Sequence, residues 1–447
     1  MGEVKEVKKS PKLKRRVSLF ALTVYGVGNI LGAGIYALIG EVVGKTGNIS
    51  WLAFLLASIT GALTGLSYAE LSAMYPKSAA EFVYTEEAFK KRNLSFLLGW
   101  IIIFSGILSA ATVALAFGGY LSELIGISLP IFTIIFAIFL VLLLSLVNLI
   151  GIKTSTRTNI IFTLIEASGL IIIIILSFFG QQEPNYFLLP SGSSFVVIFS
   201  AVALIFFAYI GFEDIANIAE EVKEPQKNVP KAIVYSIIIT TIIYCFTAIA
   251  VVKILPYNLI EGSDAPLKDV ATEILGPGGG ILMSSIALFA TANTVLIMLI
   301  VTSRMMYGMA RDKALPESLS RISPKYRTPI IAVLLTAGFT LIPIFFGDIS
   351  LIAHATVFGV LINFFLVNIS LIVLRRKKPD LERPFELKPS YKGVPIIALL
   401  GSIICIALLF TFDWLIILIQ VIIVLIGIGV FYAMRSKIET KSIKKIN

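Results

Sequence analysis

Four glycines in one apolar stretch are the residues of this sequence whose spacing most suggests ligand binding. Gly26, Gly28, Gly32 and Gly34 lie within residues 26–36, near the middle of the first long apolar segment. Each glycine in a helix interior costs about 1 kcal/mol relative to alanine, so the cluster predicts a helix that opens here. In hydrocarbon, an opened backbone is tolerated only where it lines a cavity or is buried in protein. Close helix packing through small residues is the alternative, and both interpretations stay open on this stretch alone.

Acidic residues inside apolar segments are the second candidate for chemistry. Glu213 and Asp214 lie in the sixth long apolar segment, and Glu166 lies midway along the fifth. A charged residue at membrane depth costs about 3 kcal/mol even on forgiving scales, so it usually marks a functional pathway. We expect Glu213 and Glu166 to bind and release a proton or to couple to a cation. Asp214 is expected to point elsewhere, in a cytoplasmic or structural role. A structural hydrogen bond to a neighbouring helix is the alternative for both glutamates.

The elements that would position these residues are membrane-spanning helices. Hydrophobic residues make up 57% of the 447 residues and charged residues 14%, whereas soluble domains carry about 25% charged residues. The composition predicts an all-α integral membrane protein with 12 transmembrane helices, most of which reach the roughly 20 residues that a spanning helix needs. The expected segments are 17–39, 51–75, 94–121, 129–150, 158–179, 195–216, 232–252, 281–307, 330–346, 352–374, 395–412 and 414–434.

The distribution of basic residues predicts the orientation. With the N-terminus in the cytoplasm, only Lys45, Lys253 and Lys268 of the 37 Lys and Arg fall outside. We therefore expect a multi-pass protein of the cell (plasma) membrane with both termini cytoplasmic, and we expect no nucleic-acid partner. The loops are too short for a soluble domain. Two of them are expected to hold short helices, a surface-lying amphipathic one over 78–92 in the cytoplasm and another over 260–276 outside.

Interruptions recur five segments apart in the sequence. Gly211 and two acids interrupt the sixth apolar segment, as the glycines interrupt the first. Paired interruptions of this kind are typical of two inverted five-helix repeats, whose broken helices form a binding site for carboxylates and ions near the membrane midplane. The sequence therefore predicts one site shared by segments one and six.

Short motifs along nearly the whole chain carry a family resemblance. The sequence resembles the amino acid–polyamine–organocation (APC) superfamily of transporters, in its amino acid permease and cationic amino acid transporter branch. Each motif is weak alone, but their joint order and spacing are specific for the superfamily, though not for a substrate. The motifs are GAGIY at 32–36, LSYAEL at 66–71, MYPK at 74–77, EFVY at 81–84, GFE at 211–213, EEVKEPQ at 220–226, VPKA at 229–232, MARD at 309–312, LP at 315–316, RTP at 327–329, LRR at 374–376, PDL at 379–381 and RPF at 383–385.

The resemblance implies a LeuT-type 5+5 inverted repeat with helices 1 and 6 broken, plus two peripheral helices. It also implies alternating access for an amino acid, without covalent chemistry and without a cofactor or metal. The expected domains are a cytoplasmic tail over 1–16, a transport core of helices 1 to 10 over 17–374 with repeats at about 17–180 and 195–374, peripheral helices 11 and 12 over 375–434, and a cytoplasmic tail over 435–447.

The motif match also implies the substrate-binding groups. An amino acid brings a carboxylate and an ammonium into the membrane, and backbone groups at broken helices suit both. The carboxylate would bind backbone N–H groups of Gly32, Ala33 and Gly34. The ammonium would bind carbonyl groups of Asn29, Ile30, Phe207, Ala208 and Ile210. Phe207 and Tyr209 would close over the substrate as an aromatic gate, with ordinary packing as the alternative.

Glu166 departs from the family pattern. Several proton-coupled relatives carry a lysine near this position, whose ammonium stands in for a bound sodium ion, and the departure puts that lysine mechanism in doubt. A carboxylate here would titrate, or bind a cation together with groups of the eighth helix. Those groups are Thr291, Asn293 and Thr294. Glu213 is the other expected coupling residue.

These features together predict proton-coupled uptake of L-amino acids by a secondary active transporter in the lipid bilayer. A proton-independent exchanger of amino acid against amine is the closest alternative, and a transporter-like amino acid sensor is another. An intramembrane enzyme is disfavoured because His354 is the only histidine, which leaves no histidine cluster. A channel would need polar rings along a pore, whereas the polar residues here gather at the midplane. The features specify neither the amino acid nor the oligomeric state.

Overall fold

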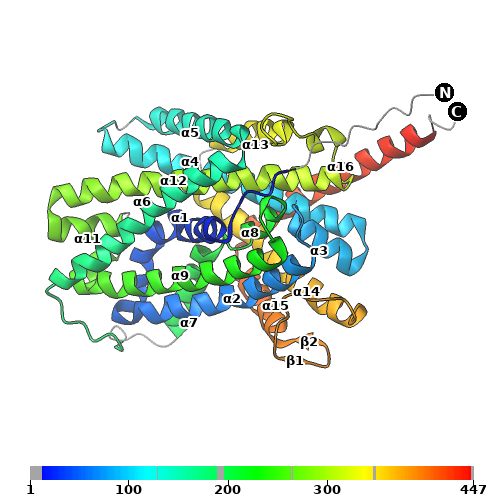
Figure 1. Cartoon of the computed structure of the whole chain (residues 1–447). Helices are drawn as coiled ribbons and strands as arrows, with labels where there is room; N and C mark the ends of the chain where they lie inside the picture. The colour runs from blue at the N-terminus through cyan, green and yellow to red at the C-terminus, as the bar shows by residue number, and fades with distance from the viewer. Residues whose placement is uncertain are drawn as a thin grey trace.

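The computed structural model describes residues 13–127, 129–188, 196–261, 263, 265–345 and 349–443, in which long helices run side by side in one bundle (Figure 1). The long helices are α1 (Leu19–Thr46), α2 (Ser50–Met74), α4 (Arg92–Leu124), α5 (Pro130–Ile150), α6 (Ile152–Leu176), α9 (Pro225–Ile254), α12 (Pro277–Arg311), α14 (Ile349–Lys377) and α16 (Trp414–Ile443). Shorter helices are α3 (Ala80–Phe89), α7 (Val196–Phe206), α8 (Asp214–Asn217), α10 (Tyr257–Ile260), α11 (Pro266–Leu275), α13 (Ile330–Ile344) and α15 (Ile396–Leu409).

Short 3-10 turns and one small hairpin complete the described elements. The turns are η1 (Gly47–Ile49), η2 (Ser177–Phe179), η3 (Phe207–Tyr209), η4 (Ala219–Glu221) and η5 (Glu317–Ser320). Strands β1 (Ser390–Tyr391) and β2 (Val394–Pro395) pair antiparallel, with Ser390 opposite Pro395. The sequence did not predict this hairpin.

The length and apolarity of the helices make the chain an all-α integral membrane protein. Within the described residues, nine helical stretches are long and apolar enough to cross a membrane, and three shorter apolar helices, α7, α13 and α15, accompany them. These twelve follow the order of the twelve predicted segments. The buried share of the apolar window is 78% in α12 and 76% in α1, but only 28% in α5 and 22% in α16. Helices α1 and α12 therefore form the centre of the bundle, and α5 and α16 its periphery.

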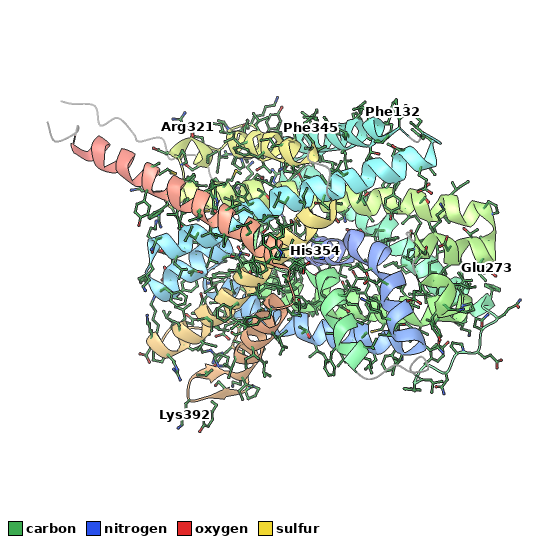
Figure 2. All side chains as sticks on the ribbon, turned by 180° about the vertical axis from the view of Figure 1, so that it is seen from behind. Phe132, Glu273, Arg321, Phe345, His354 and Lys392 are labelled. Carbon is green, nitrogen blue, oxygen red and sulfur yellow. The ribbon has the colours of Figure 1, made fainter. Side chains whose placement is uncertain are left out.

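The two ends of the bundle differ. Helix α3 and the β1–β2 hairpin lie at one end, and α11 lies at the other (Figure 1). Lys392, in the turn of the hairpin, and Glu273, on α11, mark these opposite ends (Figure 2). We call them the α3 end and the α11 end. The short helix predicted within 260–276 is present as α11.

Helix α3 corrects one expectation. A helix forms within 78–92 as predicted, but it does not lie on the surface, because most of its side chains are buried against the bundle. Its carboxylate Glu81 is fully buried and accepts hydrogen bonds from Tyr68 Oη at 3.0 Å and from Asn217 Nδ2 at 3.2 Å. Burial raises the pKa of Glu81, and the hydrogen bonds to its carboxylate oppose that shift. Glu81 therefore fastens α3 to α2 through Tyr68 and to the last residue of α8 through Asn217.

A buried ion pair ties η4, the turn that follows α8, to α12. Arg304 is fully buried, and its Nε lies 3.1 Å from Glu221 Oε2, while its Nη1 donates to Asn148 Oδ1 at 3.0 Å. Two helical turns further along α12, Arg311 pairs with Glu220. Both pairs join η4 to α12 at the α3 end.

The pair between Arg304 and Glu221 generates a stability prediction. Arg304→Met is expected to lower the free energy of unfolding by about 3–5 kcal/mol, because it leaves a buried carboxylate without its partner. The double variant Arg304→Met/Glu221→Leu is expected to recover most of that loss. Thermal unfolding in detergent measures both, with Arg321→Met, at an exposed arginine (Figure 2), as the control. A single variant as stable as the wild type would contradict the role given to this pair.

Candidate functional site

Helix α1 is interrupted at Gly32. This residue has φ 27° and ψ −164°, while the chain on both sides remains helical. A Cβ added there would lie 2.9 Å from Thr294 Oγ1 on α12, so both the backbone conformation and the close approach of α12 favour glycine. A helix that restarts after Gly32 has first-turn N–H groups without intrahelical acceptors, and the half before it ends in unpaired carbonyls.

The other three glycines of the cluster serve packing. A Cβ on Gly28 would collide with Thr163 of α6, and one on Gly26 would collide with Ser236 of α9. At Gly34, an added Cβ would lie 3.2 Å from Cα of Ala208, a residue of η3. Both interpretations of the glycine cluster therefore hold, each for different residues.

The sixth apolar segment is also interrupted. Helix α7 ends at Phe206, η3 follows, and Gly211 has φ 130° before α8 begins at Asp214. The Gly211 N–H donates to Glu213 Oε2 at 2.8 Å, so the glutamate caps the turn that interrupts its own helix. The two interruptions lie against each other in the centre of the bundle.

Asn29 links the two interruptions through its side chain. Its Nδ2 donates to the Gly211 carbonyl at 2.7 Å and to Asp214 Oδ2 at 2.6 Å. Of the two roles expected for Asp214, this bond fits the structural one, since its side chain is buried and faces α1. The residue lies only three positions after Gly211, so the irregular turn redirects it toward the first helix.

Tyr244 of α9 lies at the carbonyls of both breaks. Its hydroxyl is 2.6 Å from the carbonyl oxygen of Ile30, 3.1 Å from that of Leu31 and 3.2 Å from that of Ala208. Two of these, Ile30 and Ala208, belong to the carbonyl set predicted to bind an ammonium. Tyr244 was not predictable from the sequence, because a tyrosine within an apolar segment is ordinary.

The predicted aromatic gate is described only in part. Tyr209 is buried, and its hydroxyl donates to the Phe54 carbonyl at 3.2 Å. Its ring meets that of Tyr244 edge to face at 5.3 Å between centroids. The side chains of Phe207 and Ala33 lie outside the described residues, so the gate assigned to Phe207 stays a prediction. Ile210, which follows Tyr209, is half-buried.

Glu166 and Asn293 meet next to the first break. Asn293 Nδ2 donates to Glu166 Oε2 at 3.3 Å and to Thr163 Oγ1 at 3.0 Å, and it lies 3.5 Å from the Gly28 carbonyl oxygen. Asn159 donates to Asn293 Oδ1 at 2.8 Å, while Glu166 Oε1 is buried without a hydrogen-bond partner among the described residues.

The two threonines predicted for the same cluster bond elsewhere. Thr291 and Thr294 donate to carbonyls of their own helix, Ala287 and Ala290. Of the predicted coupling groups on α12, Asn293 is therefore the one that contacts the Glu166 carboxylate.

Arg304 is a further residue that the sequence reasoning missed, although its signal was available. It is a lone cation within the apolar segment 281–307, and a charge at that depth usually has a buried partner. A cavity of about 340 Å³ also lies at the α3 end, lined by residues including Phe82, Arg92 and Arg311. None of the residues that line this cavity belongs to the interruptions of α1 or of the sixth apolar segment.

The break at Gly32 generates a second prediction. Gly32→Ala is expected to lower the free energy of unfolding by about 1–3 kcal/mol, since alanine disfavours this φ and its Cβ meets Thr294. Gly338→Ala on α13 is the matched control, because an added Cβ there meets nothing within 4 Å. Thermal unfolding of both variants in detergent makes the comparison. Equal stability of the two would show that Gly32 is not strained.

Comparisons with known proteins agree with the described architecture. A family model of amino acid permeases matches residues 17–431. The branched-chain amino acid permease BcaP of Bacillus subtilis (strain 168) is 29% identical over 448 aligned positions, covering 94% of this chain and 93% of BcaP. From the same organism, the methylthioribose transporter is 28% identical, covering 89% and 88% of the two chains, and the serine/threonine exchanger SteT is 27% identical, covering 95% and 98%. The chain belongs to the amino acid permease family of the APC superfamily.

Proposed function

We propose that this protein is a secondary active transporter that carries L-amino acids across the cell membrane by alternating access, in uptake coupled to protons. The observation that carries the proposal is the meeting of two interrupted helices, where carbonyls of Ile30 and Leu31 on α1 face that of Ala208 on η3. We further propose twelve spans in a LeuT-type arrangement of two five-helix repeats, with the α3 end in the cytoplasm together with both termini.

The two breaks supply complementary groups for a zwitterion. The half of α1 that begins after Gly32 presents first-turn N–H groups and the positive end of its helix dipole, which suit the substrate carboxylate. Carbonyls at the end of the preceding half and in η3 suit the ammonium. Because backbone groups bind both ends, this site needs no charged side chain for the common part of an amino acid. A site of this kind agrees with a binding motif that consists of glycines and not of charged residues.

Proton coupling is proposed for Glu213 and Glu166. Each carboxylate is buried and accepts a hydrogen bond at a break, Glu213 from the Gly211 N–H and Glu166 from Asn293, which also touches the Gly28 carbonyl. Protonation would weaken these bonds, since a neutral carboxyl is a poorer acceptor than a carboxylate. Binding of a proton would thereby loosen both breaks, and its release would tighten them.

Exchange is the second candidate, and the name of one relative favours it. SteT is described as a serine/threonine exchanger and aligns over 95% of this chain. An exchanger of this architecture would bind substrate at the same two breaks but would require substrate on both sides of the membrane. The methylthioribose transporter, a relative named for a different kind of solute, makes a broad substrate panel necessary.

Reconstitution into liposomes tests the proposal. With an inward proton gradient, we expect labelled amino acid uptake to rise about tenfold over uptake without the gradient, the equivalent of 1.4 kcal/mol. Glu213→Gln and Glu166→Gln are each expected to abolish that stimulation while leaving exchange with internal substrate. Glu123→Gln, at an exposed acid paired with Lys268, is the control and should keep it.

Each alternative has its own outcome in that experiment. Gradient-driven uptake that survives both glutamate substitutions would overturn the coupling assignment. Uptake that depends on internal substrate and ignores the gradient would indicate an exchanger. Uptake of methylthioribose but of no amino acid would contradict the proposal that the substrates are amino acids.

A further inference from the structure

Tyr244 places one hydroxyl against three backbone carbonyls. Its oxygen lies 2.6 Å from Ile30 O, 3.1 Å from Leu31 O and 3.2 Å from Ala208 O. A tyrosine hydroxyl has a single proton to donate, so it can satisfy one of these carbonyls at a time. The other two contacts then bring oxygen against oxygen without a proton between them. The position is therefore better suited to a group with more donors.

An alkylammonium is such a group. It carries three N–H donors and no acceptor, which matches three converging carbonyl oxygens. The carbonyls also come from both broken helices, so a group that binds all three joins α1 to η3. Tyr244 itself is fully buried and belongs to neither broken helix, because it projects from α9.

We propose that the Tyr244 hydroxyl is an internal placeholder for the substrate ammonium, which holds the carbonyls in the empty protein and is displaced when substrate binds. The inference rests on the proposed function in one respect, since it takes the substrate to be an amino acid. It adds a residue outside the broken helices that competes with substrate for the same acceptors. Tyr244 is thus a positioning and specificity residue of the site.

Displacement of Tyr244 would also change the packing of the aromatic rings beside it. Its ring packs edge to face against Phe54 of α2, at 5.6 Å between centroids, and against Tyr209 of η3 at 5.3 Å. The hydroxyl of Tyr209 in turn donates to the Phe54 carbonyl. A ring wedged between α2 and the second break cannot leave its place without moving one of them. Binding of the ammonium is therefore linked to movement of η3 against α2.

Selectivity for the amine follows from the competition. A substrate gains by displacing the hydroxyl only if it offers more donors than the hydroxyl does. A primary ammonium offers three and an N,N-dimethylated one offers a single donor, so dimethylation is expected to remove the advantage. An analogue without the amine leaves Tyr244 in place and binds through its carboxylate alone.

The first test compares Tyr244→Phe with the wild type in purified protein. L-Leucine and L-serine are the first probes, followed by the remaining common amino acids, and each is paired with its des-amino acid, 4-methylpentanoate or 3-hydroxypropanoate for the first two. Without the competing hydroxyl, the variant is expected to bind the amino acid about fivefold to tenfold more tightly. Binding of the des-amino acid is expected to stay the same.

Tyr84→Phe is the matched control. It removes a buried tyrosine hydroxyl that has no hydrogen-bond partner among the described residues, so amino acid affinity should not change. Equal or weaker amino acid binding by Tyr244→Phe would overturn the placeholder role. If the wild type binds no amino acid of the panel, the proposed function fails first and the placeholder role falls with it.

A second measurement keeps the hydroxyl and so does not depend on the stability of the phenylalanine variant. 3-Fluorotyrosine placed at position 244 reports its surroundings through its ¹⁹F resonance. Saturating amino acid is expected to shift this resonance, whereas the des-amino acid is expected to leave it in place. The same resonance with and without bound amino acid would mean that the side chain is not displaced.

Discussion

Backbone polar groups freed by an interrupted helix must find partners within the protein, and this constraint organises the centre of the structure. An unsatisfied N–H or C=O in hydrocarbon costs several kcal/mol, so a break at Gly32 is stable only if other groups reach its carbonyls. Tyr244 from α9 reaches Ile30 and Leu31, and Asn293 from α12 approaches Gly28. The surrounding helices therefore stabilise the break. The glycines of α1 contribute to this, because they let those helices approach closely.

The two ends of the bundle are held by contacts of unequal strength. At the α3 end, the pair between Arg304 and Glu221 is buried, and removing one partner of such a pair is costly. At the α11 end, the described pair between Lys268 and Glu123 is solvent-exposed, and pairs of that kind contribute little. Opening at the α11 end therefore breaks the weaker of the described ion pairs.

The predictable part of this structure is the part that depends on residue type along the chain. The lengths of the apolar segments predicted where the helices lie along the chain. Gly32 and Gly211 marked the interruptions, because glycine adopts a positive φ without steric cost. The orientation of polar side chains was not predictable in the same way. Asp214 faces α1, and Tyr244 lies at both breaks, since packing between helices distant in sequence decides where each side chain points.

The carbonyls of α1 that Asn293 and Tyr244 contact lie close enough together to link the binding of a proton to the binding of the substrate ammonium without a long pathway. Asn293 donates a hydrogen bond to Glu166 and also contacts the carbonyl of Gly28. Tyr244 contacts the carbonyls of Ile30 and Leu31. All three carbonyls belong to the last turn of one half-helix. In the proposed mechanism, a proton on Glu166 changes what Asn293 donates to, and an ammonium replaces the Tyr244 hydroxyl two residues further on. Coupling then needs only one turn of helix with two arrangements, which is a physical element that both sites bias directly.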